Sequence, residues 1–385
     1  MISRYFDHLV YFFVCLSVIF YVPIREGTGN PVEYGYQVQE LFFRYGVFFV
    51  FLVSLFLKPL RQADLRVLSA FLIYEMLLCA LFGFNIVSRR VLLNLVSGAL
   101  FYKVVSEYMT VRLKTFGFWA LGLLAINSLL MVFQVFNLDH LFTHAGKIEL
   151  GLKTIAFDEK VIGFMKLKAN VGTLGALLGM VLAFIHPIIS ILAVPFMILG
   201  QTSAGIAAFV ISFLFALFFR LKRRIWMILV ILILLGSGFY VLKYDLPAGQ
   251  FQERFKVWHE ATFIILKTNP IIGAGPDSFS LNHILTPQGE GFESIEWKWA
   301  HNEYLQTLFE YGLAGLFFLG LFLRNQIIDF VKFRQDRDIQ LLFSTCLSIA
   351  LISMFSFPLH VGKFAGLCVL ILALYHAKVS ELRCL

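Results

Sequence analysis

The sequence has few charged residues. Asp, Glu, Lys and Arg make up 15% of its 385 residues, whereas hydrophobic residues make up 59%, and the mean hydropathy is +0.81. A soluble globular domain usually carries about 25% charged residues. The composition excludes an ordinary soluble domain and indicates a chain embedded in a membrane.

Cysteine is also scarce, and no cysteine belongs to a metal-binding or redox motif. The sequence contains no Cys-x-x-Cys pair and no Cys/His cluster, and its histidines lack metal-ligand spacing with one another. We therefore expect neither disulfides nor a metal site. The cysteines lie in apolar runs or at the C-terminal end: Cys15, Cys79, Cys346, Cys368 and Cys384.

Pro/Ser-rich linkers, low-complexity tracts and convincing repeats are absent, so residues 1–385 are predicted to form one polytopic membrane domain. Apolar runs recur at close to the ~20 residues that cross a bilayer core. We expect an all-α integral membrane protein with about 12 transmembrane helices, although the pair of runs around Pro187 also fits one broken helix. The runs are 8–22, 42–57, 67–84, 91–109, 116–136, 171–185, 187–199, 203–219, 225–242, 302–323, 340–357 and 361–377.

Lysine and arginine predict the orientation. The first run has no small-residue cleavage site after it, so we interpret it as an anchor. With the N-terminus inside, every short inner loop is basic, as the positive-inside rule expects. The long segments 137–170 and 243–301 then lie outside. The inner basic segments are Lys58–Arg66, Arg112–Lys114, Arg220–Arg224, Arg324–Arg337 and the tail with Lys378 and Arg383.

The net charge of +8 is partly a consequence of this topological bias. We therefore expect no nucleic-acid partner. The positive excess in the outer loops needs another explanation, and an anionic lipid-linked substrate is one.

The second outer loop, 243–301, is predicted to be partly helical. Arg254 falls within the apolar arc of its helical pattern. An arginine on an apolar face costs free energy unless an anion or a carboxylate meets it. Arg254 is therefore either a structural residue, paired or reaching headgroups, or a ligand for an anion. The arc consists of Phe251, Phe255, Trp258, Thr262 and Ile265.

Pro270 ends this helical pattern, and Gly273-Ala-Gly275-Pro276 predicts a tight turn. The backbone amides of such a turn can hold a phosphate oxygen. A plain turn explains the same residues, so both interpretations stay open.

His301 is predicted to begin the next membrane helix, on one stripe with Leu305, Leu308, Gly312 and Gly315. Small residues on a stripe allow close helix packing, so the imidazole is expected to face the bundle. A helix N-terminus disfavours the imidazolium and favours a neutral ring that can accept a proton. The alternative is a boundary histidine hydrogen-bonded to a loop carbonyl.

Three more cations are candidates for anion binding. Arg89 and Arg90 lie on the outer side between the third and fourth runs, where the positive-inside rule disfavours them. Lys168 ends the first outer loop, just before a predicted helix start at 169–175. Lipid headgroups are the alternative partners of the arginines.

Taken in order, these motifs resemble those of the bacterial O-antigen ligase and O-antigen polymerase superfamily. The matching features are Arg254 followed by Trp258, the turn Asn269-Pro-Ile-Ile-Gly-Ala-Gly-Pro276, and His301-Asn302 followed nine residues later by Gly312-Leu-Ala-Gly315. The last pattern is similar to the ligase signature. The layout of the whole chain, with a large outer loop between the ninth and tenth spans, also looks like that of the ligases.

The resemblance implies an inverting glycosyl transfer at the periplasmic face of the bacterial inner membrane, with both termini cytoplasmic and without a metal or cofactor. The donor would be a glycan on undecaprenyl diphosphate, and the acceptor a sugar hydroxyl of lipid A–core. The implied base is His301, and the implied main diphosphate contact is Arg254. Further candidates for binding the diphosphate or the glycan are Arg89, Arg90, Lys168, Asn302, Trp258, Gly273 and Gly275.

The chain departs from the family pattern at one place. Members often carry a Ser-Arg pair at the outer start of the helix before the loop, where this chain has Ser203-Ala204. Another cation, such as Arg89, Arg90 or Lys168, would have to replace that arginine, or else the substrate differs.

Other functions fit part of the pattern. An O-antigen polymerase uses the same donor with a lipid-linked glycan as acceptor, and a protein O-oligosaccharyltransferase transfers the glycan to protein. A lipid or polysaccharide transporter would need charged residues along a path through the membrane. Glu75 and Glu107 are the candidates for such a path, although pairing with each other or with Arg44 also explains them.

Overall fold

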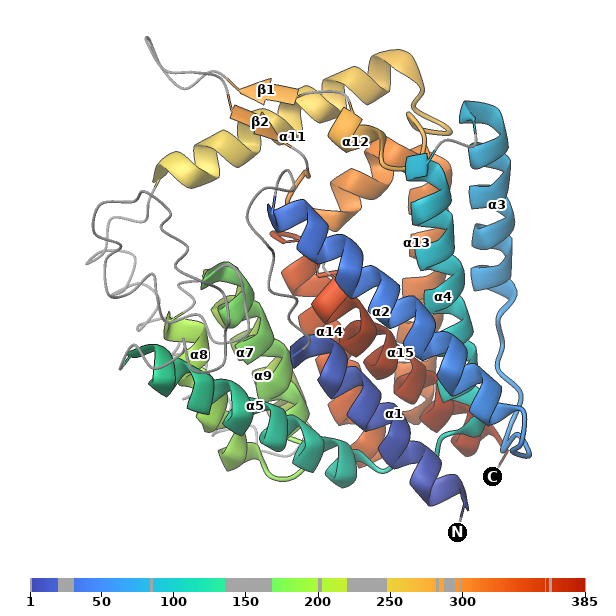
Figure 1. Cartoon of the computed structure of the whole chain (residues 1–385), viewed down its shortest axis with the longest axis vertical. Helices are drawn as coiled ribbons and strands as arrows, with labels where there is room; N and C mark the ends of the chain where they lie inside the picture. The colour runs from blue at the N-terminus through green and yellow to red at the C-terminus, as the bar shows by residue number, and fades with distance from the viewer. Residues whose placement is uncertain are drawn as a thin grey trace.

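The computed structural model describes residues 2–19, 31–83, 86–135, 168–199, 203–219, 248–281, 284–286, 295–297, 299–356, 358–359 and 362–384. These residues form a helical bundle with one helix laid across its end (Figure 1). The bundle helices are α1 (Ile2–Ile19), α2 (Pro31–Ser54), α3 (Arg66–Phe82), α4 (Ile86–Tyr108), α5 (Leu113–Val135), α7 (Lys168–Leu182), α8 (Val194–Leu199), α9 (Ser203–Phe218), α13 (Glu303–Phe333), α14 (Arg337–Ser353) and α15 (Gly362–Arg383).

The helices coincide with the apolar runs of the sequence, apart from the run 225–242, which lies outside the described residues. Within the described ranges, three helices are long and apolar enough to cross a membrane: Leu113–Val132 of α5, Glu303–Phe333 of α13, and Phe364–Arg383 of α15. Shorter apolar helices accompany them. This helical content fits a membrane protein.

The two runs around Pro187 form a hairpin, rather than one broken helix or two full spans. After α7 the chain turns, and Pro187 starts the 3-10 helix η2 (Pro187–Ala193), which leads directly into the six-residue α8. His186 caps η2, because its ring accepts a hydrogen bond from the Ile188 amide at 3.3 Å. Both η2 and α8 pack back along α7.

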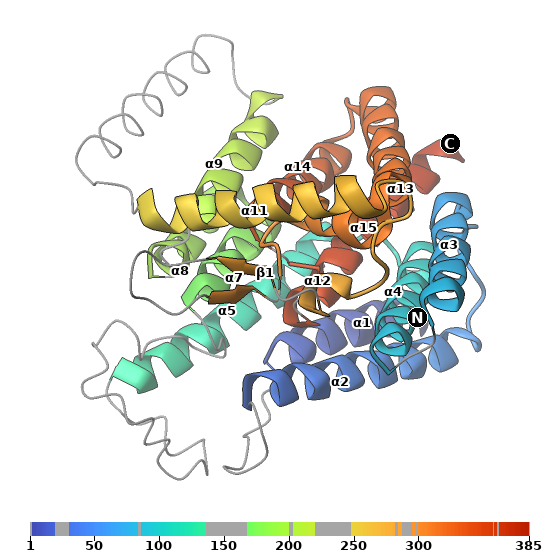
Figure 2. The ribbon, with the colours of Figure 1, turned by 90° about the horizontal axis from the view of Figure 1, so that it is seen from above.

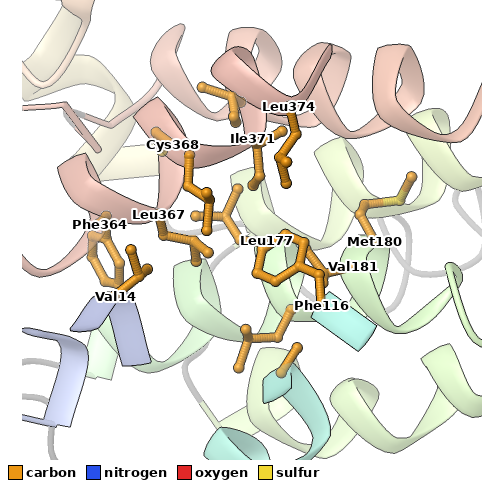
Figure 3. Packing of buried hydrophobic residues seen from close by; sticks show 14 of the residues in the cluster. Val14, Phe116, Leu177, Met180, Val181, Phe364, Leu367, Cys368, Ile371 and Leu374 are labelled. Carbon is orange, nitrogen blue, oxygen red and sulfur yellow. The ribbon is translucent and has the colours of Figure 1, made fainter. Parts of the chain in front are cut away.

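The main core includes α7 and α15, which are the most enclosed helices. Leu177, Met180 and Val181 of α7 belong to the same buried hydrophobic cluster as Leu367 and Ile371 of α15 (Figure 3). Helices from the rest of the bundle surround this pair, since α15 also packs against α1, α2, α4 and α14, and α7 packs against α5, α9 and α14. A helix that is apolar all round must be buried on all sides, and α7 shows this pattern.

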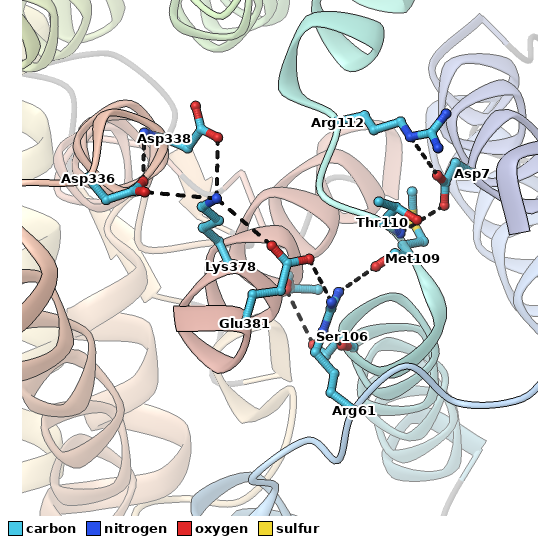
Figure 4. Close-up of polar contacts among 11 residues, drawn as sticks. Asp7, Arg61, Ser106, Met109, Thr110, Arg112, Asp336, Asp338, Lys378 and Glu381 are labelled. Carbon is cyan, nitrogen blue, oxygen red and sulfur yellow. Dashed lines mark hydrogen bonds and ion pairs between the residues drawn. The ribbon is translucent and has the colours of Figure 1, made fainter. Parts of the chain in front are cut away.

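Both chain termini lie at the end of the bundle away from the crossing helix (Figure 1). Ion pairs join the loops there. Arg61, between α2 and α3, pairs with Glu381 of α15 at 2.8 Å. Lys378 lies within 4 Å of three carboxylates, those of Asp336, Asp338 and Glu381 (Figure 4). Ion pairs therefore join three of the predicted inner segments, Lys58–Arg66, Arg324–Arg337 and the C-terminal tail, whereas Arg220–Arg224 lies outside the described residues.

The crossing helix is α11 (Ala248–Thr268), which lies over the opposite end of the bundle (Figure 2). It has a small core of its own, in which Val257, Ala261 and Ile265 pack against Phe279 and Phe309. Beside it are the four-residue helix α12 (Ser278–Leu281) and an antiparallel hairpin of β1 (Ile284–Thr286) and β2 (Ile295–Trp297). The hairpin is an addition to the predicted all-α fold.

Candidate functional site

Arg254 lies on the buried side of α11, as its position in the helical pattern predicts. Val257, Ala261 and Ile265 are fully buried on this side, and Arg254 is partly buried. The prediction for Phe255 was wrong, because its side chain is 59% exposed on the opposite side of the helix. Phe251 belongs to α11, but its side chain is outside the described part of the structure.

Arg254 and Trp258, one helical turn apart, connect α11 to two loops of the bundle. The Arg254 guanidinium donates to the carbonyl of Phe355, between α14 and α15, at 3.1 Å. The Trp258 indole N–H donates to the carbonyl of Ala300, just before α13, at 2.7 Å. These contacts bring the α14–α15 connection and the residue before His301 under the same face of α11.

His301 precedes α13 rather than beginning it. Its backbone has a φ of +51°, in the left-handed region that only a few per cent of non-glycine residues adopt. Asn302 is the N-cap, and its side-chain oxygen accepts hydrogen bonds from the amides of Tyr304 and Leu305 at 3.0 and 3.1 Å. The expected placement of His301 on a helical stripe was therefore wrong, and Asn302 has a capping role.

The His301 imidazole is held in its neutral form. Burial, assisted by the positive charge of Arg254, lowers its pKa from 6.5 to about 4. Burial also lowers the pKa of Arg254, although an arginine stays protonated at neutral pH. The His301 ring is thus neutral because of burial and the Arg254 charge, rather than because of the helix N-terminus that the sequence suggested. A neutral imidazole and a guanidinium near each other can accept a proton and stabilise an anion.

Gly312 breaks α13 into two halves. Its φ of +63° and ψ of −162° are not helical, so the helix kinks there. The kink leaves backbone groups without helical partners, and the turn after α11 supplies them. The Leu313 and Ala314 amides donate to the carbonyls of Pro270 and Ile271, at 2.9 and 3.0 Å.

The turn and the kink approach closely because both have a glycine at the contact, Gly273 and Gly312. A Cβ atom on Gly273 would lie 2.5 Å from the Glu310 carbonyl oxygen, and one on Gly312 would lie 2.6 Å from the Gly273 amide nitrogen. Both glycines also have positive φ. The first glycine of the family signature therefore serves backbone-to-backbone docking, and the expected close packing of helices through a continuous small-residue stripe was wrong.

The plain-turn interpretation of Gly273–Gly275 agrees with the hydrogen bonds. The three amides on which phosphate binding would depend are already donated: Gly273 to Asn269, Ala274 to Phe309, and Gly275 to Glu310, over 2.8–3.0 Å. Each acceptor is a backbone carbonyl. These amides support the fold of the site rather than offering an anion cradle.

Tyr74 of α3 completes this junction. Its hydroxyl lies 2.9 Å from the Tyr311 carbonyl and 3.3 Å from the Ile272 carbonyl. Helix α3, the turn and the kink are thus connected. The predicted pairing of Glu75 and Glu107 with each other or with Arg44 was wrong. Arg44 pairs with Glu40, and Glu107 pairs with Lys103. Glu75 accepts a hydrogen bond from the Cys79 thiol.

The remaining cations differ in how they are used. Arg90 makes a two-pronged ion pair with Glu40, at 2.5 and 2.6 Å, so the fold already neutralises it. Arg89 is exposed near the start of α4. Lys168 begins α7 and Ala204 lies in the first turn of α9, but the Lys168 side chain lies outside the described residues.

Buried polar residues that were not predicted as site residues lie on the first turns of α13, after His301. The Glu303 carboxylate is buried and accepts from the Leu359 amide at 2.9 Å, and Gln306 and Glu310 are hydrogen-bonded to each other at 2.9 Å. Polar residues spaced by three and four positions in an apolar helix were the available signal. The Phe355 carbonyl has no such signal, because every residue carries one.

Within the described part of the chain, no group of three or more His, Cys, Asp or Glu residues could hold a metal ion. The polar side chains described at the site are those of Arg254, His301, Glu303, Gln306 and Glu310.

Comparison with protein families agrees with this geometry. Residues 188–320 match the model of the O-antigen ligase family. Over these residues the chain is similar to the O-antigen ligase family. The matched region runs from η2 through α11 and the turn to beyond the kink of α13, and so includes Arg254, His301 and Gly312.

The O-antigen ligase family includes ligases and polymerases, which are glycosyltransferase-type membrane enzymes acting on lipid-linked glycans. A search of curated proteins gave no match to this chain.

Proposed function

We propose that this protein is an O-antigen ligase that transfers a glycan from undecaprenyl diphosphate to a sugar hydroxyl of lipid A–core. The observation that carries the proposal is the juxtaposition under α11 of a neutral, partly buried His301 with the Arg254 guanidinium. Diphosphate is already a good leaving group. The reaction therefore needs a base for the acceptor hydroxyl and a cation for the charge that develops on the diphosphate.

In this mechanism the His301 imidazole takes the proton of the acceptor hydroxyl as its oxygen attacks the anomeric carbon. The bond from that carbon to the diphosphate oxygen breaks, and Arg254 stabilises the diphosphate leaving group. A single direct attack inverts the anomeric carbon, and this chemistry needs neither a metal nor a nucleotide. Arg89 is the candidate second cation, since Arg90 pairs with Glu40.

The proposal includes the topology. About 12 spans form a single membrane domain in the bacterial inner membrane, with both termini cytoplasmic. The loops 137–170 and 243–301, and with them α11 and the active site, face the periplasm. The position of both termini at the end opposite α11 supports this arrangement.

The test is a lipopolysaccharide gel of the source bacterium after deletion of the gene, complemented by the wild-type chain or by His301→Ala. A ligase predicts loss of every O-antigen band and accumulation of lipid-linked polymer, with rescue by the wild type alone. Survival of a core-plus-one-unit band while the ladder disappears would identify a polymerase instead. Full rescue by His301→Ala would remove the general-base role.

A further inference from the structure

Ala300, the residue before His301, is held from two directions through the peptide groups on either side of it. Ala300 is buried, and its carbonyl accepts the Trp258 indole N–H at 2.7 Å. Its amide N–H donates to the side-chain oxygen of Gln306, on the first turns of α13, at 3.4 Å. Ala300 is therefore fixed to α11 by its carbonyl and to α13 by its amide.

Gln306 suits this position because a primary amide is both a donor and an acceptor. Its side chain is almost fully buried, with 1% of the residue exposed, and its NH₂ group donates to the Glu310 carboxylate at 2.9 Å. The backbone N–H of Ala300 can only donate, so the Gln306 side-chain oxygen must face it. The NH₂ group then faces the Glu310 carboxyl group.

His301 needs such support because its backbone is strained. A left-handed conformation costs a non-glycine residue free energy, and it persists only where the surroundings impose it. On the far side of His301, Asn302 is fixed as the cap of α13. On the near side, the restraint comes from Trp258 and Gln306.

We propose that Gln306 is a positioning residue, whose side-chain amide fixes the Ala300 peptide and thereby the left-handed backbone of His301. This inference rests on the proposed function, in which His301 is the base. Without the restraint, His301 relaxes toward an ordinary conformation, and its imidazole moves relative to the acceptor hydroxyl. Displacement of a reacting group by about 1 Å can slow a reaction about 100-fold.

The test measures glycan transfer by purified full-length variants, with a lipid-linked glycan donor and lipid A–core acceptor, across the pH range. Gln306→Leu is expected to lower kcat by about 10- to 100-fold while the donor KM stays within about twofold. The acid limb of the kcat profile is expected to move toward the ordinary histidine range, because the displaced ring becomes more hydrated.

The matched control is Gln326→Leu. Gln326 is a buried glutamine on the same helix, beyond the Gly312 kink. Its replacement is expected to change neither kcat nor the acid limb. If Gln306→Leu does not give folded protein, Trp258→Phe removes the other restraint on Ala300, keeps an aromatic ring, and is expected to move the limb in the same direction.

A wild-type kcat and acid limb in folded Gln306→Leu would overturn the inference, as would a raised KM with unchanged kcat. Failure of the proposed function gives a different result, because His301→Ala would then be as active as wild type in the same assay. An inactive His301→Ala with a fully active Gln306→Leu would leave the proposed function standing and remove only the role of Gln306.

Discussion

Arg61 and Arg254 are partly buried arginines at opposite ends of the bundle, and the fold treats them differently. Arg61 has a carboxylate partner, Glu381 at 2.8 Å, and it also donates to the Ser106 and Met109 carbonyls at the end of α4. Arg254 donates to the Phe355 carbonyl and, among the described residues, has no ion pair with a carboxylate. Burial lowers the pKa of both groups.

The contrast extends to the surroundings of the two residues. The Arg61 end is fastened by side-chain ion pairs, including Arg383 with Asp329 at 2.5 Å. The Arg254 end is fastened by backbone hydrogen bonds between the 269–275 turn and the kink of α13. At the proposed diphosphate site, backbone hydrogen bonds hold the scaffold and do not use the positive charge of Arg254 in an ion pair with a described carboxylate.

The largest expected effect tests the backbone junction. Gly312→Ala should destabilise the protein by about 3 kcal/mol, because a left-handed alanine is strained and its Cβ would collide with the turn. Thermal unfolding in detergent measures this loss. Gly320→Ala is the control on the same helix, since its Cβ would meet no atom within 4 Å. Equal stability of the two variants would contradict the docking role of Gly312.

The next effect tests the charge of Arg254. Arg254→Lys should slow transfer about 100-fold with little change in stability, because an ammonium cannot reproduce the two-pronged contact of a guanidinium with a diphosphate. Steady-state transfer rates provide the measurement. Arg61→Lys should leave the rate of folded protein unchanged. Near-normal transfer by Arg254→Lys would count against the assigned diphosphate contact.

The third effect concerns Arg61, whose replacement should change stability and leave activity unchanged. Arg61→Met should lower stability by about 2 kcal/mol, less than for a fully buried pair because the Glu381 side chain is 32% exposed. Transfer per folded molecule should not change. Urea titration and an activity assay on the same preparation separate the two quantities. Arg66→Met is the control, because its pair with Asp64 lies in solvent and should contribute little.

The smallest effect is on the pH dependence. The acid limb of kcat/KM should lie near pH 4, where His301 becomes protonated, and should move to higher pH in Arg254→Gln, because loss of the positive charge favours the imidazolium. Burial contributes more than Arg254, so the limb should remain below 6.5. An acid limb at the same pH in Arg254→Gln would show that the charge of Arg254 does not influence the pKa of His301.

The same depressed pKa affects stability. The folded protein binds this proton less readily than the unfolded chain, so the contribution of His301 to stability is lost as the pH falls from 6.5 toward 4.

The sequence predicted the helices and the buried side of Arg254 because both follow from local periodicity. Apolar runs locate the bundle helices, and the spacing of Trp258 and Ile265 places Arg254 on the inner side of α11. The proposed roles of Arg254 and His301 as a pair came from the family resemblance, since no local rule relates residues 47 positions apart.

The kink at Gly312 was missed because its cause is not local. A helical pattern continues through 303–323 without interruption, and only the turn some 40 residues earlier explains why a glycine there leaves the helix. Phe255 was assigned to the wrong side because a hydrophobic residue was assumed to face inward. The acceptors of Arg254 and Trp258 are main-chain carbonyls, which residue type does not reveal.

The half-helix between Asn302 and Gly312 fixes the distance and the rotation between these two residues. Its nine residues, Glu303–Tyr311, span about 13 Å, and its two ends are attached to different partners, the His301 segment at one and the Gly273 turn at the other. Insertion of one residue would rotate Gly312 by about 100° away from Gly273. The interval should therefore tolerate many changes of side chain and no change of length, and in related sequences the two glycines should be inherited together.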